Sequence, residues 1–225
     1  MSQSGTPSQI ALPLAGHLPT NAQRIVIGNA NAAVIEALQT PERWPFHVAV
    51  LTGPTRSGKS LIGRWARAHI GAARLEVIDN AETVGETDLF HRWNGVQQGG
   101  TKEGGALLII ANADQEHAES EMGSWRIALP DLASRIGGSL QLAIQAPDDD
   151  MAAELILAHA EQRGLSLPDG ATDYLVPRTT RSFAAIEALV AAIDRISLER
   201  QTPATMSVWR AALEALHGPE QQRLL

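Results

Sequence analysis

The sequence predicts an α/β fold in which a parallel β-sheet lies between helices and is followed by a small C-terminal bundle of helices. In the first two thirds of the chain, apolar runs rich in β-branched residues alternate with helical patterns. Each run is apolar throughout, which is typical of a parallel strand covered on both faces. Beyond Pro147 the strand-like runs end and only helical patterns continue.

The expected strands and helices of the α/β part follow in chain order. Residues 24–28 indicate a short strand or turn, and residues 30–38 a helix. The apolar runs that we interpret as the core strands are FHVAVLTG (46–53), RLEVIDNAE (74–82) and ALLIIA (106–111). The helices expected between them are SLIGRWARAHI (60–70) and DLFHRWNGVQQGG (88–100), the latter ended by its glycines.

Four helical segments are expected after the α/β part. They are DDDMAAELILAHAEQRG (148–164), DGATDYLVPRT (169–179), RSFAAIEALVAAIDRISLER (181–200) and a helix that begins near Thr205. We therefore divide the chain into a flexible tail (1–20), an α/β core (21–147) and a helical domain (148–225). Trp65, Trp93 and Trp209 fall within helical patterns and are expected to pack in the interior.

Composition restricts the class of protein. The formal net charge of −7 over 225 residues argues against a protein that coats nucleic acid, because such binding neutralises phosphates with Lys and Arg. No apolar run approaches the ~20 residues of a membrane span. The chain has no cysteine and no recognisable export signal. These observations predict a cytoplasmic protein without membrane contact.

The strongest chemical signal is GPTRSGKS, residues 53–60, which has the pattern of a phosphate-binding loop. The residues expected to bind a nucleotide are Gly53, Pro54, Thr55, Arg56, Ser57, Gly58, Lys59, Ser60 and Leu61. Backbone N–H groups would surround the phosphates and Lys59 would neutralise their oxygens, while Ser60 would offer its hydroxyl to Mg²⁺. Lys59 is one of only two lysines in the chain.

A carboxylate at the end of a neighbouring strand is expected to complete the Mg²⁺ site. Asp79 has this place, and we predict that it holds the metal together with Ser60. Asn80 follows where many hydrolases have a second acid, so strong intrinsic hydrolysis is not expected, although Glu82 could partly compensate. Asn112 and Asp114, after the third strand, fit equally well a role at the γ-phosphate and an ordinary turn.

With these elements placed, the sequence resembles the AAA+ ATPases and, among them, the DnaA group. The segment LPDLASRIGGSLQLAIQAPDDD (129–150) resembles the part of DnaA-type proteins that carries an arginine finger and leads into the helical lid. The resemblance implies that Arg135 is this finger and that RIVIGNAN (24–31), with Ile27, lies beside the adenine. It also implies an arginine at the start of the third lid helix, where our alignment places Ala184; Arg181, expected one helical turn earlier, would substitute.

A DnaA-like core and lid without the initiator's DNA-binding domain, preceded by a short tail, resembles the Hda family. The chain ends where an initiator would continue into that domain, so no direct sequence-specific DNA binding is expected. QIALPL (9–14) resembles the peptide with which the family docks on the sliding clamp, with Gln9, Leu12, Pro13 and Leu14 as anchors. The resemblance implies binding of ADP or ATP with Mg²⁺, and the DnaA initiator and the sliding clamp as partners.

In this interpretation the protein negatively regulates initiation by inserting Arg135 beside the ATP of a DnaA molecule, whose hydrolysis it promotes. Two other interpretations stay open at this stage. The first is an autonomous AAA+ ATPase that remodels or loads another protein as a homo-oligomer, with QIALPL incidental. The second is a DnaA-like adaptor without a catalytic role, in which the nucleotide only stabilises the fold.

Overall fold

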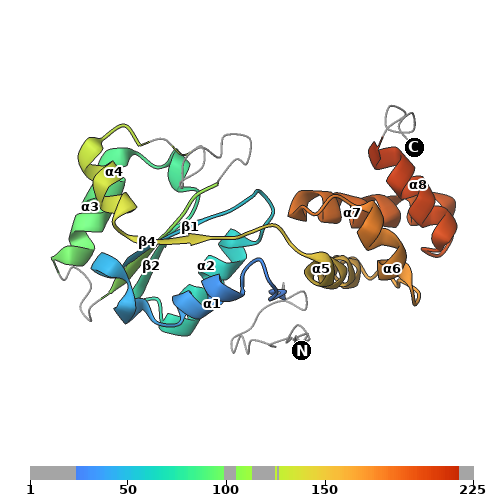
Figure 1. Cartoon of the computed structure of the whole chain (residues 1–225), viewed down its shortest axis with the longest axis horizontal. Helices are drawn as coiled ribbons and strands as arrows, with labels where there is room; N and C mark the ends of the chain where they lie inside the picture. The colour runs from blue at the N-terminus through green and yellow to red at the C-terminus, as the bar shows by residue number, and fades with distance from the viewer. Residues whose placement is uncertain (1–23, 99–104, 113–124, 126, 218–225) are drawn as a thin grey trace, which may run out of the picture. The chain divides into compact units, whose positions relative to one another are not determined.

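The computed structural model describes residues 24–98, 105–112, 125 and 127–217 (Figure 1). The chain divides into two compact units. The α/β unit consists of residues 31–145. The helical unit combines residues 146 onward with the segment that ends at Ala30. In the described part of the chain, no helix is both long and apolar enough to cross a membrane.

Four parallel strands form the sheet of the α/β unit, in the order β2-β3-β1-β4. They are β1 (Val48–Thr52), β2 (Leu75–Ile78), β3 (Ala106–Ile110) and β4 (Leu140–Ala143). The two central strands, β1 and β3, are buried along their whole length. The predicted α/β class with a parallel sheet is thereby confirmed.

The sequence analysis did not identify β4, which pairs with β1 at one edge of the sheet. Its residues alternate between half-buried and exposed, so the sequence LQLA has no continuous apolar run. The first predicted strand also begins two residues later than expected, because Pro45–His47 form a 3₁₀ turn in which Phe46 and His47 have positive φ. Residues 24–27 are irregular and are followed by a turn.

Helices cover both faces of the sheet (Figure 1). The helices of this unit are α1 (Ala32–Leu38), α2 (Lys59–Ile70), α3 (Glu86–Gln97) and α4 (Pro130–Gly137), with 3₁₀ turns at Pro41–Arg43, Pro45–His47 and Ala81–Thr83. On the side of α3 and α4, Val48, Val50, Leu107 and Ile109 pack against Leu89, Trp93, Leu132 and Ile136. On the other side α2 approaches the sheet so closely that a Cβ at Gly63 would meet Ile110 at 2.5 Å.

The helical unit is built from α5 (Asp149–Gln162), α6 (Ala171–Leu175), a 3₁₀ turn (Val176–Arg178), α7 (Phe183–Arg200) and α8 (Met206–His217). Side chains cap two of these helices. Asp148 accepts a hydrogen bond from the Met151 backbone N–H at 2.9 Å, and Ser182 accepts one from Ala185. The caps fix the starts of α5 and α7.

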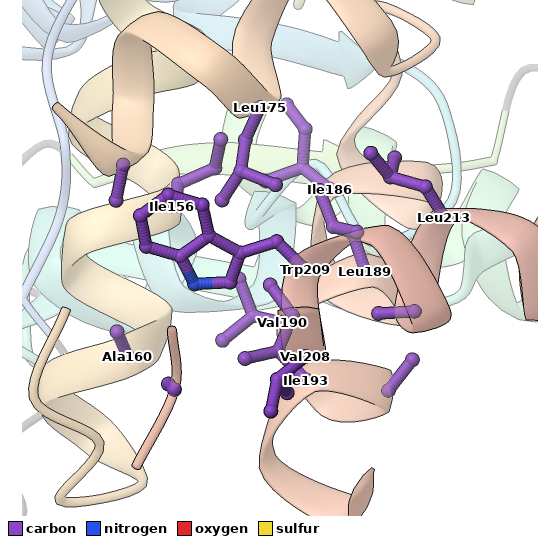
Figure 2. Close-up of a cluster of buried hydrophobic side chains, with 14 of the residues drawn as sticks. Ile156, Ala160, Leu175, Ile186, Leu189, Val190, Ile193, Val208, Trp209 and Leu213 are labelled. Carbon is purple, nitrogen blue, oxygen red and sulfur yellow. The ribbon is translucent and has the colours of Figure 1, made fainter. Parts of the chain in front are cut away.

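Trp209 of α8 lies at the centre of the helical unit (Figure 2). It is 4% exposed, and Tyr174 packs against it with ring centroids 5.9 Å apart. The fully buried aliphatic residues of the same cluster are Ile156, Leu175, Leu189, Val190, Ile193 and Val208. Within the described structure the Trp209 indole N–H is buried without a hydrogen-bond partner. Trp209 therefore contributes through the volume and apolar area of its ring.

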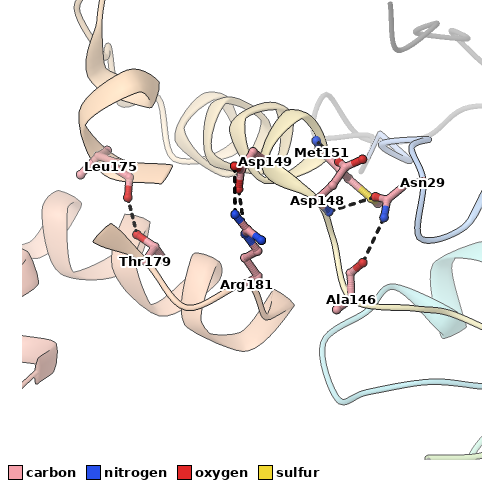
Figure 3. A network of polar contacts seen from close by, with 8 residues as sticks. All are labelled: Asn29, Ala146, Asp148, Asp149, Met151, Leu175, Thr179 and Arg181. Carbon is pink, nitrogen blue, oxygen red and sulfur yellow. Dashed lines mark hydrogen bonds and ion pairs between the residues drawn. The ribbon is translucent and has the colours of Figure 1, made fainter. Parts of the chain in front are cut away.

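The segment before Ala30 is fixed to the start of α5 (Figure 3). The Asn29 side-chain amide donates to the Ala146 carbonyl at 3.2 Å and accepts from the Asp148 backbone N–H at 3.0 Å. Arg24 forms ion pairs with Glu154 at 3.5 Å and with Glu161 at 3.8 Å. These contacts make residues 24–30 part of the helical unit.

His159 in α5 gives the helical unit a pH dependence. Burial lowers the pKa of His159 below its ordinary 6.5; the nearby Glu187 opposes the shift and Arg163 adds to it. Just below pH 6.5 the unfolded chain therefore binds more protons than the folded chain. The free energy of unfolding does not depend on His159 well above pH 6.5, and it decreases as the pH falls below 6.5.

We expect His159→Gln to lose less stability than the wild type between about pH 7.5 and about pH 5.5. The difference in slope should stay below the roughly 1.4 kcal/mol per pH unit that one proton permits. Urea unfolding at a series of pH values measures it, with His91→Gln, at an exposed position of α3, as the control. Equal slopes in the wild type and His159→Gln would contradict the prediction.

Candidate functional site

The loop between β1 and α2 has the backbone of a phosphate site. Gly58 precedes α2 with φ +83°, a left-handed conformation that glycine adopts easily. No side chain caps the start of α2. Its first-turn N–H groups are therefore available to an anion, and the helix dipole favours negative charge at the same place.

Lys59 is buried at the base of this loop, with 7% of its surface exposed. Its ammonium group donates to the carbonyl oxygens of Gly53 at 2.8 Å and Pro54 at 2.7 Å. Burial lowers the pKa of Lys59, whereas the negative charges of Glu82 and, to a smaller extent, Asp79 raise it. The loop carbonyls thus hold the charged group where phosphate oxygens would compete for it.

The remaining loop residues fit a polyphosphate. The Ser57 hydroxyl is buried and has no hydrogen-bond partner in the described structure, which is the environment of a group that awaits a ligand. Thr55 and Arg56 are exposed at the tip, and Ser60 lies half-buried in the first turn of α2. With the uncapped helix start, these features are compatible with phosphate binding, and the role of residues 53–61 stays a prediction from the sequence.

A set of polar residues gathers where β2 and β3 end. Asp79 follows β2, and Asn112 comes shortly after β3. Glu82 accepts hydrogen bonds from the Asn112 backbone N–H at 3.4 Å and from its side-chain amide. The parallel pairing of β2 with β3 brings the two ends together. Asp114, two residues after Asn112, lies outside the described residues.

The carboxylate that acts more strongly on Lys59 is Glu82 and not Asp79. From the sequence, Asp79 was predicted to hold the Mg²⁺ because it follows the strand directly. The signal for Glu82 was its place three residues later, in the 3₁₀ turn Ala81–Thr83, which brings the side chain back toward the end of β3. Asp79 accepts from the Asn80 backbone N–H at 3.0 Å.

Arg135 stands in the last turn of α4 and makes its side-chain contacts with α3. Its guanidinium carbon lies 4.8 Å from the centre of the Phe90 ring and 4.7 Å from that of Trp93. One guanidinium N–H donates to the Asn94 side-chain oxygen at 2.6 Å. Because α4 ends just before β4 begins, whereas Lys59 follows the end of the parallel strand β1, Arg135 and Lys59 lie toward opposite ends of the parallel strands.

Ile27 and Arg181 belong to the helical unit. Ile27 is half-buried in the irregular segment before Gly28. Arg181 forms a two-bond ion pair with Asp149, at 2.8 and 3.0 Å (Figure 3). It precedes α7, which begins at Phe183, so our expectation that Arg181 lies on the helix one turn before Ala184 was wrong. The reason is the Ser182 cap, which starts the helix after Arg181.

The predicted clamp-binding residues Gln9, Leu12, Pro13 and Leu14 lie outside the described residues. Their role stays a prediction from the sequence.

Lys59→Ala is expected to weaken ADP binding by about a hundredfold, because it removes a charged donor that serves the phosphates. The dissociation constant can be measured by isothermal titration calorimetry. Arg67→Ala is the matched control, since it removes a positive charge from the exposed side of the same helix. An ADP affinity that is unchanged in Lys59→Ala, or equally weakened in Arg67→Ala, would contradict the prediction.

Comparison with solved structures identifies the fold of the chain. Domain III of the Thermotoga maritima replication initiation protein DnaA matches with a TM-score of 0.64 and 13% identity, over 85% of this chain and 94% of that one. A structure of the replication initiator DnaA bound to AMPPCP and single-stranded DNA matches with a TM-score of 0.56 and 15% identity, over 79% and 66% of the two chains. The Holliday junction branch migration motor RuvB of Thermotoga maritima matches with a TM-score of 0.58 and 14% identity, over 84% and 70%.

These likenesses show an AAA+ fold with a C-terminal helical unit, as the sequence predicted. The helical unit carries the more specific signal, because residues 148–213 match the family model described as "Hda, lid domain". That range begins at the Asp148 cap of α5 and extends into α8. The chain thus joins a region that matches the Hda lid-domain model to a core with the fold of DnaA domain III.

Proposed function

We propose that this protein regulates the initiation of DNA replication by binding adenine nucleotide, docking on the sliding clamp and promoting hydrolysis of the ATP bound to DnaA. The observation that carries the proposal is Arg135, whose guanidinium is held on α3 at the end of α4 and separately from Lys59 of its own chain. An arginine so placed can act on the nucleotide of another molecule. The proposal sets the protein in the cytoplasm, with the replication proteins that it contacts.

The nucleotide site supports the first part of this proposal. Residues 53–61 would hold the phosphates of ADP or ATP, and Ser60 and Asp79 would hold Mg²⁺, which neutralises the charge of the phosphate oxygens when bound. For Ile27 and Arg181, a role in nucleotide binding stays a prediction from the sequence. Asn80 in place of a second acid, and the pairing of Glu82 with Asn112, favour slow turnover by the protein itself. The nucleotide would then serve mainly as a structural ligand.

Clamp docking rests on QIALPL and on the match of residues 148–213 to the Hda lid-domain model. Gln9, Leu12, Pro13 and Leu14 would enter a pocket of the clamp, and the extended peptide would hold the protein beside clamp-loaded DNA. This tethering raises the effective concentration of Arg135 near DnaA. Hydrolysis would therefore follow clamp loading.

The test measures hydrolysis of DnaA-bound ATP in the presence of clamp-loaded DNA. We expect the wild type to stimulate hydrolysis and the double variant Gln9→Ala, Leu12→Ala to lose both clamp binding and stimulation. Gln3→Ala, in the same tail but outside the motif, is the matched control and should behave as the wild type. Stimulation by the double variant equal to that of the wild type would remove the clamp from the proposal.

A further inference from the structure

One face of α3 holds α4 along its length. Phe90 lies four residues after Glu86, and Trp93 and Asn94 lie three and four residues after Phe90, spacings that place neighbours on one side of the helix. Glu86 contacts the chain that enters α4, and the other three contact Arg135 at the opposite end. We call Phe90, Trp93 and Asn94, together with Ser139, the arginine seat.

The guanidinium of Arg135 contacts two aromatic rings and one amide oxygen. Phe90 and Trp93 lie within 5 Å of the guanidinium carbon, a distance at which the positive charge is attracted to the ring electrons. Asn94 accepts from a single N–H, that on Nη1. A guanidinium has five N–H donors and aromatic rings accept none of them in conventional hydrogen bonds, so donors beyond the one bound by Asn94 can serve an anion.

The main chain of Arg135 is fixed by the same seat. The Ser139 hydroxyl donates to the Arg135 carbonyl at 2.9 Å and accepts from the Trp93 indole N–H at 3.4 Å. Both Trp93 and Ser139 are buried. Trp93 therefore restrains the guanidinium with its ring and the end of α4 through Ser139.

The start of α4 is restrained as well. Both carboxylate oxygens of Glu86 accept backbone hydrogen bonds, from Ala128 at 2.7 Å and from Leu129, the residue before α4, at 2.8 Å. The helix that carries Arg135 is thus attached to α3 at both ends. These contacts with α3 fix the orientation of α4.

The partners of Arg135 differ from those of several other arginines of the described structure, although Arg178 likewise contacts an aromatic ring, that of Tyr174, and donates to a carbonyl oxygen. Four other arginines pair with carboxylates, namely Arg24, Arg92, Arg181 and Arg195. Arg135 instead has a neutral amide oxygen and two aromatic rings. Such partners orient a guanidinium without cancelling its charge, which an arginine needs if it is to stabilise negative charge elsewhere.

We propose that Phe90, Trp93 and Asn94 are positioning residues that hold the Arg135 guanidinium ready to contact the phosphates of ATP bound to a second protein. This inference rests on the proposed function, in which that protein is DnaA. An arginine that is already oriented loses little conformational freedom when it meets the phosphates, so the seat speeds the reaction by preorganisation. The opposite role, storage of Arg135 away from its target, predicts that a weakened seat raises the rate.

The test compares Phe90→Leu and Asn94→Ala with the wild type in stimulated hydrolysis of DnaA-bound ATP. Each variant should lower the maximal rate by about tenfold, while the protein concentration that gives half of it stays unchanged. Phe90→Tyr, which keeps an aromatic ring, is the matched control and should retain the wild-type rate. A rate that stays unchanged or rises in both Phe90→Leu and Asn94→Ala would overturn the inference.

A spectroscopic measurement makes the result independent of activity. In protein with ¹⁵N-labelled arginine, the Arg135 Nε–H signal is assigned by its absence from Arg135→Lys. Ring currents of the seat should displace this signal in the wild type and in Phe90→Tyr, and Phe90→Leu should reduce the displacement. If the Arg135 Nε–H signal of the wild type were not displaced from the position of an exposed arginine, the inference would be overturned even if the variants lost activity.

Failure of the seat can be told from failure of the proposed function with Arg135→Ala. If Arg135→Ala abolishes stimulation while Phe90→Leu and Asn94→Ala retain it, the seat is wrong and the proposed function stands. If Arg135→Ala stimulates as well as the wild type, the proposed function is wrong and the inference fails with it.

Discussion

Arg135→Ala is expected to lower the stimulated hydrolysis of DnaA-bound ATP by about 10³-fold or more, the range known for arginine fingers. The physical reason is charge. A guanidinium beside the transferred phosphoryl group stabilises negative charge that develops in the transition state, and alanine offers nothing in its place. The rate is measured on preformed DnaA-ATP with clamp-loaded DNA, and this protein is present in excess over DnaA.

The control for this prediction is Arg92→Ala. Arg92 belongs to α3, the helix that carries the arginine seat, but its side chain pairs with Glu76. Its removal takes away the same charge from the neighbouring helix without changing the contacts of Arg135. Both variants should bind ADP and the clamp as the wild type does. Equal losses in Arg92→Ala and Arg135→Ala would mean that overall charge, and not one placed arginine, accounts for the effect.

The fold was predictable wherever a local pattern determined it. The phosphate loop needs a buried strand before it and a helix after it, and both lie next to each other in the sequence, as β1 and α2 do. The edge strand β4 was missed because one exposed side gives it no continuous apolar run. Its place beside β1 depends on pairing with a strand about ninety residues earlier, which no local pattern indicates.

The candidate site was likewise predictable only where a local sequence pattern determines it. Lys59 and the loop around it follow from eight consecutive residues. The stronger influence of Glu82 on Lys59 depends on how the 3₁₀ turn after β2 folds back toward Asn112, which spacing alone does not show. Trp93 was expected to be a packing residue, and it is buried as predicted. Its contact with Arg135, however, arises only when α4 packs on α3.

Trp209→Ala should have the largest effect on stability, with a loss of about 3–5 kcal/mol in the free energy of unfolding. The ring fills the centre of the helical unit between α5, α6 and α7, and alanine would leave a cavity that the fully buried aliphatic residues around it cannot close. Urea unfolding of the full chain, followed by far-ultraviolet circular dichroism, measures the loss.

The comparison with Trp209→Phe decides which property of the ring matters. Because the indole N–H is buried without a partner in the described structure, phenylalanine gives up no hydrogen bond and removes a desolvated polar group while it keeps most of the apolar volume. Trp209→Phe should therefore cost well under half of what Trp209→Ala costs. An equal cost for both variants would show that the N–H has a partner in solution, and the helical unit would then depend on a polar contact at its centre instead of on packing alone.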